Sequence, residues 1–402
     1  MLIGVVGKPS TGKSTFFKSC TLADVEIANY PFTTIHPNHA IGFVKIDCVD
    51  KDFNKQCNPR IGYCVNNKRF VAVDLLDVAG LVPGSHAGVG MGNKFLDDLR
   101  QADALIHVID ISGSTNEKGE SVPALSYDPI KDVEFLEYEL DMWYLGLIKK
   151  GWDKFVKQQG VEKKELNKAV AKQLSGLGVS EGLAESVLRN YNENLNSWNE
   201  RDLIKFAKHL RRETKPIIIA ANKIDVKGSE KNIERLKERF GDYIIIPCSA
   251  FAELALREFA KNNLIKYIPG ENKFEITGNL NDKEKKILDY IKIEILDKYG
   301  GTGIQDVLNK AVFDLLKYIA IFPGGLNNLV DSQGRILPDC FLMKDGSTAL
   351  DFAYKLHTDL GDSFIRAIDV KKKLTVGKEH KLKHRDVIEI VSGKWLELNR
   401  NA

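Results

Sequence analysis

The sequence has few cysteines, almost no net charge and no long hydrophobic run. Six cysteines are scattered through 402 residues, unlike the dense disulfide framework of a small secreted domain, and this favours free thiols in a reducing compartment. Lysine and arginine (58) nearly balance aspartate and glutamate (55), so any nucleic-acid contact needs a local basic patch. No stretch approaches the roughly 20 apolar residues that cross a bilayer, and the apolar start ends at Gly7 and Lys8, which argues against a signal peptide. We therefore expect a soluble, cytoplasmic protein with no membrane contact.

The order of apolar segments predicts an α/β fold. At about 150 residues per domain, the length suggests two to three domains. Helical spacing of leucines replaces the strand pattern over 131–212, which predicts an insertion of mutually packed helices. After a break at 323–325, strand-like segments around one amphipathic helix predict a small mixed sheet with a β-grasp-like outline. Short apolar runs alternate with helical stretches, as in a doubly wound, mostly parallel sheet, at 2–6, 70–76, 104–109, 216–221 and 243–247.

The clearest motif is GxxxxGK[ST] at residues 7–14, directly after the first predicted strand and before a predicted helix over 15–20. In such a loop, backbone N–H groups and the following helix N-terminus converge on phosphate oxygens. Lys13 supplies a positive charge, Ser14 offers a hydroxyl to Mg²⁺, and Gly12 permits a close approach that a side chain would block. The predicted phosphate-binding residues are Gly7, Lys8, Pro9, Ser10, Thr11, Gly12, Lys13, Ser14 and Thr15.

Three further segments follow buried strands and therefore meet the same edge of the sheet. Asp77 begins a DxxG motif and can hold Mg²⁺ through water, while Gly80 presents its N–H to a γ-phosphate. In the NKID segment, the Asp225 carboxylate can accept both the N1–H and the exocyclic amino group of guanine, a donor pair that adenine lacks. Asn222 and Lys223 complete this motif. The backbone N–H groups of Ser249 and Ala250 are expected near guanine O6.

Together these motifs resemble the translation-factor-related P-loop GTPases. The segment NYPFTTIHPN at 29–38 resembles the first switch of the Obg class. Residues 78–84, the glycine-rich segment 88–96 and the C-terminal segments 342–348 and 357–360 resemble the YchF subfamily, also called Obg-like ATPases. The resemblance covers nearly the whole chain and implies a P-loop GTPase domain over 1–130 and 213–335, a helical insertion over 131–212 and a TGS domain over 336–402. It further implies that a switch threonine, Thr34 or else Thr33, coordinates Mg²⁺ in the triphosphate state.

The residue after the DxxG motif is Leu81, where many small GTPases place a glutamine that orients the attacking water. Hydrolysis is therefore expected to be slow unless a group from elsewhere or from a partner assists. His86 is one candidate to polarise water, and a solvated loop histidine is the alternative. The expected catalytic set is thus Lys13, Thr34, Gly80 and His86. Ser10 stands where K⁺-dependent relatives often carry asparagine, which leaves a potassium requirement open.

The resemblance leaves the choice of purine open, because many YchF relatives carry glutamate at the last position of the base motif and accept ATP. Here Lys223 and Asp225 restore the guanine-reading form, so we expect GTP and GDP as ligands and GTP hydrolysis as the reaction. Preference for ATP is one alternative. The other is a nucleotide-dependent RNA-binding adaptor with negligible turnover.

The C-terminal domain carries a basic cluster, and the TGS resemblance implies that such a domain contacts RNA or the ribosome. The alternative is a solvated strand face whose lysines keep an edge from pairing with other chains. We expect a monomer that uses this cluster to bind RNA or ribosomes. Its members are Lys371, Lys372, Lys373, Lys378, Lys381, Lys383 and Arg385.

Three cysteines lie close together in the sequence, at Cys48, Cys57 and Cys64. Their spacing lacks a CxxC pair and shows no obvious fourth ligand for zinc. We therefore expect reduced thiols packed among strands.

Overall fold

The computed structural model describes residues 1–21, 38–78, 98–157, 163–191, 197–326, 328–331 and 333–393, with backbone alone at 153–157 and 163–166. Their contacts divide them into two compact units. Unit 1 comprises the described residues of 1–22, 35–40 and 74–307, and unit 2 comprises those of 41–73 and 308–402. The predicted site residues Thr33, Thr34, Gly80 and His86, and also Leu81, lie outside the described residues.

The central sheet consists mainly of parallel strands, and most of their side chains are buried. Its order is β4-β1-β5-β6-β7, with β2 (His39–Asp47) beyond β4. Burial on both faces explains why these strands read as continuous apolar runs in the sequence. The prediction missed β2 because Gly42 and Lys45 interrupt its apolar residues. The five predicted strands are confirmed as β1 (Leu2–Val6), β4 (Lys68–Asp77), β5 (Ala104–Asp110), β6 (Ile217–Asn222) and β7 (Ile244–Cys248).

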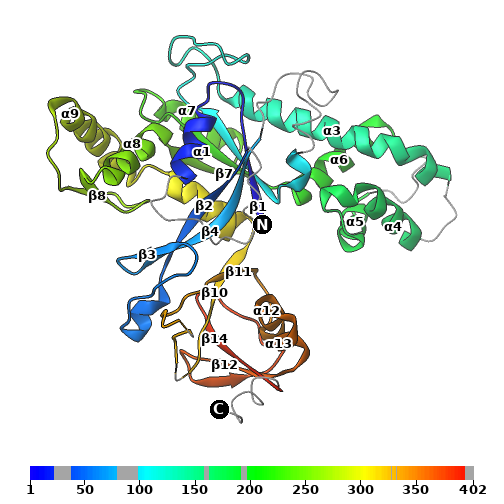
Figure 1. Cartoon of the computed structure of the whole chain (residues 1–402). Coiled ribbons are helices and arrows are strands. Elements are labelled where there is room, and N and C mark those ends of the chain that lie inside the picture. Colours follow the sequence, from blue (N-terminus) through cyan, green and yellow to red (C-terminus); the bar gives the residue numbers. More distant parts are fainter. Residues whose placement is uncertain are drawn as a thin grey trace. The chain divides into compact units, whose positions relative to one another are not determined.

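Helices flank this sheet on both sides (Figure 1). The phosphate-loop helix α1 (Lys13–Thr21) packs against α8 (Ala250–Lys261), and α7 (Glu230–Arg239) connects β6 to β7. After α8 come the hairpin of β8 (Ile265–Tyr267) and β9 (Phe274–Ile276), the helix α9 (Asp282–Tyr290), the π-helical turn Ile291–Leu296 and α10 (Asp297–Tyr299). The helix α11 (Ile304–Asn309) continues as a π-helical stretch over Lys310–Leu315.

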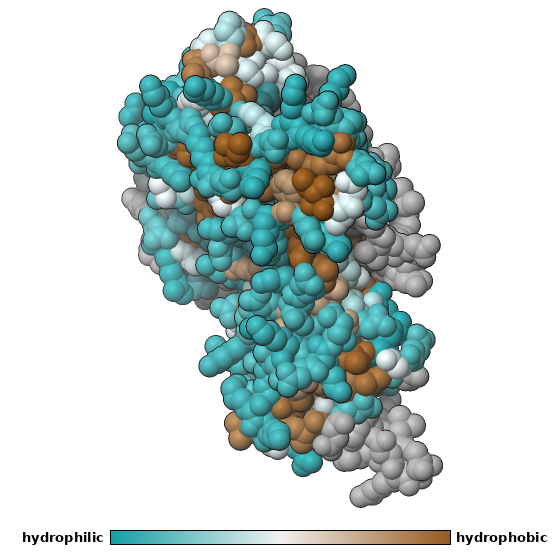
Figure 2. All heavy atoms as spheres, turned by 90° about the vertical axis from the view of Figure 1, so that its left-hand side faces the viewer, coloured by the Kyte–Doolittle hydropathy of each residue, from teal (hydrophilic) through white to brown (hydrophobic). Residues whose placement is uncertain are grey.

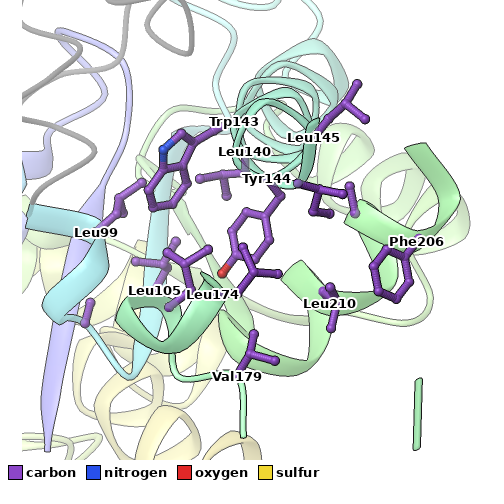
Figure 3. Close-up of a cluster of buried hydrophobic side chains, with 14 of the residues drawn as sticks. Leu99, Leu105, Leu140, Trp143, Tyr144, Leu145, Leu174, Val179, Phe206 and Leu210 are labelled. Carbon is purple, nitrogen blue, oxygen red and sulfur yellow. The ribbon is translucent and has the colours of Figure 1, made fainter. Parts of the chain in front are cut away.

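The predicted helical insertion forms α3 (Ile130–Lys157), α4 (Lys163–Leu174), α5 (Glu181–Leu188) and α6 (Glu200–Thr214). Their apolar stripes meet in one buried cluster that includes Leu140, Leu174 and Phe206 (Figure 3). The same cluster contains Val6 of β1 and Leu105 of β5. These helices therefore share a hydrophobic core with the sheet, and their mutual packing confirms the interpretation of the leucine spacing.

Unit 2 contains a mixed sheet in the order β11-β10-β14-β12-β13. The helices α12 (Ala349–Leu356) and α13 (Thr358–Asp362) accompany it, and Phe352 of α12 lies fully buried in its core. The mixed sheet agrees with the predicted β-grasp-like outline, but the one expected helix is divided into these two short helices at His357. Its strands are β10 (Tyr318–Pro323), β11 (Phe341–Lys344), β12 (Phe364–Asp369), β13 (Leu374–Val376) and β14 (Val387–Ser392).

β10 begins at Tyr318, shortly after the π-helical stretch Lys310–Leu315. β10 pairs with β11 and β14, so this sheet includes a strand that precedes the expected domain start at 336. Among the described residues, no helix combines the length and the apolar character that a bilayer crossing needs. The face shown in Figure 2 is largely hydrophilic, with small hydrophobic patches between polar side chains.

Candidate nucleotide-binding site

The loop between β1 and α1 has the backbone shape of a phosphate cradle. Ser10 and Gly12 adopt left-handed conformations, with φ of 64° and 88°. A Cβ on Gly12 would lie 2.4 Å from Asn222 Nδ2, and one on Gly7 would lie 2.5 Å from the Val108 carbonyl oxygen. The first α-helical hydrogen bond runs from Phe16 N–H to Gly12 O at 2.8 Å. The N–H groups that precede it at this helix N-terminus have no helical acceptor and suit an anion.

Asp77 lies beside this loop, at the end of β4. Its carboxylate forms an ion pair with the Lys13 ammonium, and its N–H donates to the Asn38 carbonyl oxygen at 2.8 Å. β4 and β1 are adjacent parallel strands, so their carboxyl ends reach the same sheet edge. The Asp77 carboxylate and the Ser14 hydroxyl supply the oxygen ligands that Mg²⁺ prefers, so the donor set fits this ion.

The NKID segment is physically tied to the phosphate loop. Asn222 Nδ2 donates to the Thr11 carbonyl oxygen at 2.9 Å, and Asn222 Oδ1 accepts from Ala250 N–H at 2.9 Å. Both ends of this buried amide are therefore used in holding three loops together. Asn222 thus connects the phosphate loop to the loop that begins α8.

Asp225 is held at the same edge of the sheet. Its Oδ1 accepts from Ser249 Oγ at 2.6 Å, and its carbonyl oxygen accepts from Tyr290 OH at 2.5 Å. Ser249 is itself fixed because its N–H donates to Thr302 O at 2.9 Å. No hydrogen bond to Asp225 Oδ2 occurs among the described residues, so this oxygen can accept from a ligand. The structure thus brings the predicted pair Asp225 and Ser249 together.

Sequence reasoning missed Asp110, the last residue of β5. Its carboxylate is fully buried and accepts from Lys223 Nζ at 2.8 Å. Burial raises its pKa, but the hydrogen bond and charge of Lys223 and further hydrogen bonds outweigh this and leave the pKa below its usual value. Lys223 is the second residue of NKID and has a left-handed backbone, with φ of 70°. The signal was available, because an aspartate that ends an apolar strand is followed by hydroxyl residues at 112, 114 and 115.

The side chain of Lys8 points away from the phosphate cradle. Its ammonium pairs with Asp132 at 2.8 Å, donates to Thr115 O at 3.0 Å and lies 3.9 Å from the centre of the Tyr127 ring. Both charged groups of this pair are buried, and burial raises the pKa of Asp132 to about 6 despite the charge of Lys8. Lys8, one of the predicted phosphate-binding residues, can therefore contact a phosphate only through its backbone.

Comparison with known proteins agrees with this geometry. A model described as 50S ribosome-binding GTPase matches residues 2–137, an Obg-like GTPase YGR210-like, G4 motif-containing domain matches 220–324, and a TGS domain matches 332–392. A GTP-binding protein of Methanocaldococcus jannaschii is 51% identical over 97% of this chain and 99% of the relative. A protein of Buchnera aphidicola named ribosome-binding ATPase YchF is 27% identical over 92% of this chain and 88% of the relative.

A crystal structure of a GTP-binding protein from Pyrococcus horikoshii OT3 superimposes with a TM-score of 0.75 at 40% identity. The match covers 98% of this chain and 100% of that chain. The resemblance stated from the motifs is therefore confirmed. This chain belongs to the YchF/Obg-like family of P-loop GTPases, with a C-terminal TGS domain.

Proposed function

We propose that this protein is a guanine-nucleotide switch that binds GTP with Mg²⁺, hydrolyses it slowly when unassisted, and associates with RNA or the ribosome in the triphosphate state. The observation that carries the proposal is the link from Thr11 through Asn222 to Ala250, with Asp225 held by Ser249 at the same edge. This link sets the distance between a phosphate cradle and a purine-reading carboxylate. A nucleoside triphosphate spans such a pair of subsites.

Guanine suits Asp225 better than adenine does. A carboxylate oxygen can accept from N1–H and its neighbour from the exocyclic amino group, and charge-assisted bonds of this kind are the stronger ones. Adenine presents an unprotonated N1 to the same carboxylate, so two acceptors would face each other. ATP preference remains the second candidate, because the Buchnera aphidicola relative is named an ATPase.

The residues at the phosphate end of the site explain nucleotide binding better than they explain the rate of hydrolysis. Lys13 contributes charge to the β- and γ-phosphates, and the N–H groups at the start of α1 hold their oxygens. Mg²⁺, held by Ser14 directly and by Asp77 through water, would neutralise charge that develops on the transferred phosphoryl group. In this proposal Thr34 adds a hydroxyl to the ion, Gly80 an N–H to the γ-phosphate and His86 a polarising group for water. Ser10, which stands where K⁺-dependent relatives often carry asparagine, leaves a potassium requirement open.

Turnover measurements test this function. Multiple-turnover hydrolysis of GTP and of ATP is measured with and without ribosomes, using Lys13→Ala as the control for contaminating phosphatases. GTP hydrolysis that ribosomes stimulate supports the switch. Faster hydrolysis of ATP under both conditions contradicts the choice of purine, and tight binding with no stimulated turnover favours the adaptor.

The basic cluster of unit 2 is smaller than the sequence predicted. Lys371 and Arg385 pair with Asp52, at 2.6 and 3.5 Å, and Lys372 pairs with Asp369 at 2.6 Å. The remaining members form no ion pair with a described residue and are exposed, which makes them the available phosphate contacts. These four exposed lysines are Lys373, Lys378, Lys381 and Lys383.

The partner proposal is tested by the salt dependence of ribosome or RNA binding. Each lysine that contacts a phosphate contributes about 0.7–0.9 to the slope of log affinity against log salt. Changing the four exposed lysines to glutamine is expected to lower that slope by about 3. A matched control changes four exposed lysines of unit 1, Lys231, Lys283, Lys286 and Lys292. An equal loss in both variants would show that these four lysines hold no special role.

A further inference from the structure

Three thiols and one carboxylate converge at one place in unit 2. The Sγ atoms of Cys48 and Cys57 are 3.5 Å apart, and Cys64 Sγ lies 3.6 Å from Asp50 Oδ2. The four possible ligand atoms all lie within 4.8 Å of one another. None of the three cysteines forms a disulfide.

Two backbone features bring these residues together. Cys48 directly follows β2, and Asp50 lies in the 3₁₀ turn Val49–Phe53. Cys64 lies in β3 (Tyr63–Val65), which joins β4 through a two-residue turn whose asparagines both have positive φ, as a type I′ hairpin requires. This turn packs onto the Cys48 segment, because Asn67 O accepts from Cys48 N–H at 2.8 Å and Asn67 Nδ2 donates to Asp50 Oδ1 at 3.0 Å.

The chain around Cys57 has almost no hydrophobic core of its own. Between Asp50 and Arg69, Cys57 is the only buried residue. A long segment that buries one small side chain gains little from hydrophobic burial to offset its ordering entropy. Segments of this kind are commonly ordered by a disulfide or by a metal ion.

One buried charged group belongs to the cluster, and another lies beside it. Asp50 is fully buried and makes no ion pair with a described residue. Its carboxylate instead accepts from Asn67, from Cys57 N–H at 3.0 Å and from the Cys64 thiol. Arg69 is 1% exposed, and its Nη1 lies 3.6 Å from Cys57 Sγ. A bound divalent cation would give Asp50 a cationic partner, and thiolates would give Arg69 an anionic one.

Two of the separations are close to those of tetrahedral zinc coordination, and all lie within 4.8 Å. Zn–S bonds of about 2.3 Å and Zn–O bonds of about 2.0 Å place two sulfurs about 3.8 Å apart, and a sulfur and an oxygen about 3.5 Å apart. The observed 3.5 and 3.6 Å need only small shifts of side chains. We propose that Cys48, Asp50, Cys57 and Cys64 form a structural Zn²⁺ site, with Asp50 as the fourth ligand that the cysteine spacing did not reveal.

Such a site would order the loop that carries Cys57 and so support its contact with the C-terminal part of unit 2. This loop already contacts that part through backbone bonds from Asn58 N–H to Ile336 O and from Arg60 N–H to Pro338 O, both 2.9 Å. Arg69 donates to Leu337 O and Pro338 O, at 3.0 and 2.9 Å. The metal ion would hold the Cys57 loop and the neighbouring Arg69 in place for these contacts. Its loss should therefore loosen unit 2 more than the P-loop site in unit 1.

The test measures metal content and coordination directly on the full chain. Protein reconstituted with Zn²⁺ under reducing conditions and dialysed is expected to retain one zinc per chain by mass spectrometry of the metal. Reconstitution with Co²⁺ should give the charge-transfer and ligand-field bands of tetrahedral thiolate coordination. Wild-type protein that retains no zinc and shows no such bands would overturn the proposal without any variant. A second result would also overturn it. In that case, protein purified without reductant contains a Cys48–Cys57 disulfide and, after reduction, still takes up no metal.

Variants assign the ligands. Cys64→Ser and the isosteric Asp50→Asn are each expected to weaken Zn²⁺ binding by about 100-fold or more. Cys340→Ala is the matched control, because Cys340 is a free thiol of the same unit outside the cluster. Loss of zinc from Cys340→Ala with retention in Asp50→Asn would refute the proposed ligand set. GDP binding at the P-loop should persist in all three variants, which separates loss of metal from global unfolding.

Discussion

Replacing Asp110 by asparagine should damage the base-reading end of the site, although Asp110 is absent from every motif. One carboxylate oxygen accepts from the N–H and Oγ of Ser112, at 3.1 and 2.5 Å. The other accepts from Ser114, Thr115 and Lys223, at 2.8, 2.9 and 2.8 Å. An asparagine turned either way would aim its NH₂ group at a backbone N–H or at an ammonium. Neither donor can rotate into an acceptor.

The magnitude follows from burial. Removing one partner of a buried ion pair costs about 3–5 kcal/mol. Asp110 is fully buried, but the Lys223 side chain keeps 25% of its exposure, so water compensates in part. We expect the free energy of unfolding of unit 1 to fall by about 2–3 kcal/mol, and GDP affinity to fall with it because Lys223 loses its anchor.

Urea unfolding followed by tryptophan fluorescence suits this measurement, since three of the four tryptophans, Trp143, Trp152 and Trp198, belong to unit 1. The control is Asp103→Asn at the opposite end of β5, where the carboxylate is half exposed and accepts from Leu2 N–H at 2.8 Å. Its effect should stay below about 1 kcal/mol. Because the folded-state pKa of Asp110 is lowered, its stabilisation is complete at neutral pH and disappears only in acid, below about pH 4. Equal unfolding curves for Asp110→Asn and wild type at pH 7 would refute this reasoning.

Three further changes probe other parts of unit 1. Gly12→Ala places a Cβ against Asn222 Nδ2 at a left-handed position and should abolish GDP binding by calorimetry, whereas Gly146→Ala, with open space around it, should leave it intact. Asn222→Ala leaves the Thr11 carbonyl and a buried N–H unpaired and should weaken GDP by at least 10-fold, at about 1–3 kcal/mol for each buried group; unchanged affinity would contradict the bridging role. Burial lowers the pKa of Lys215 to about 8, so the folded chain loses this proton before the unfolded chain does. Wild-type stability should therefore rise between about pH 8 and 10 relative to Lys215→Met, and parallel pH profiles would count against it.

Local sequence patterns were sufficient for the phosphate loop and the sheet of unit 1. Buried parallel strands leave continuous apolar runs, and the cradle needs glycine and lysine at fixed spacing, so both signals are contained in a few neighbouring residues. The adjacency of Asp225 and Ser249 was also predictable, because both follow strands that end at one edge. The spacing of leucines in α3 and α6 likewise identified side chains that the structure buries together.

Features that depend on distant pairing were not predictable from local patterns. Asp110 meets Lys223 because β5 and β6 are neighbours, a fact of strand order. β10 was missed because it follows a helix directly and gains strand partners only from later segments. Asp50 joins the cysteines because a hairpin turn folds back onto a 3₁₀ turn, so no cysteine spacing could indicate it.

The most direct test of the account is a calorimetric titration of GDP, ADP and XDP into wild-type protein and Asp225→Asn. The wild-type carboxylate should favour GDP over ADP by at least 100-fold, a difference of about 3 kcal/mol. An asparagine can accept from N1–H and donate to the C2 oxygen of xanthine, so the variant should lose GDP affinity and gain XDP affinity. Equal affinity of the wild type for GDP and ADP, or an unchanged purine preference in Asp225→Asn, would contradict the claim that this carboxylate selects the base.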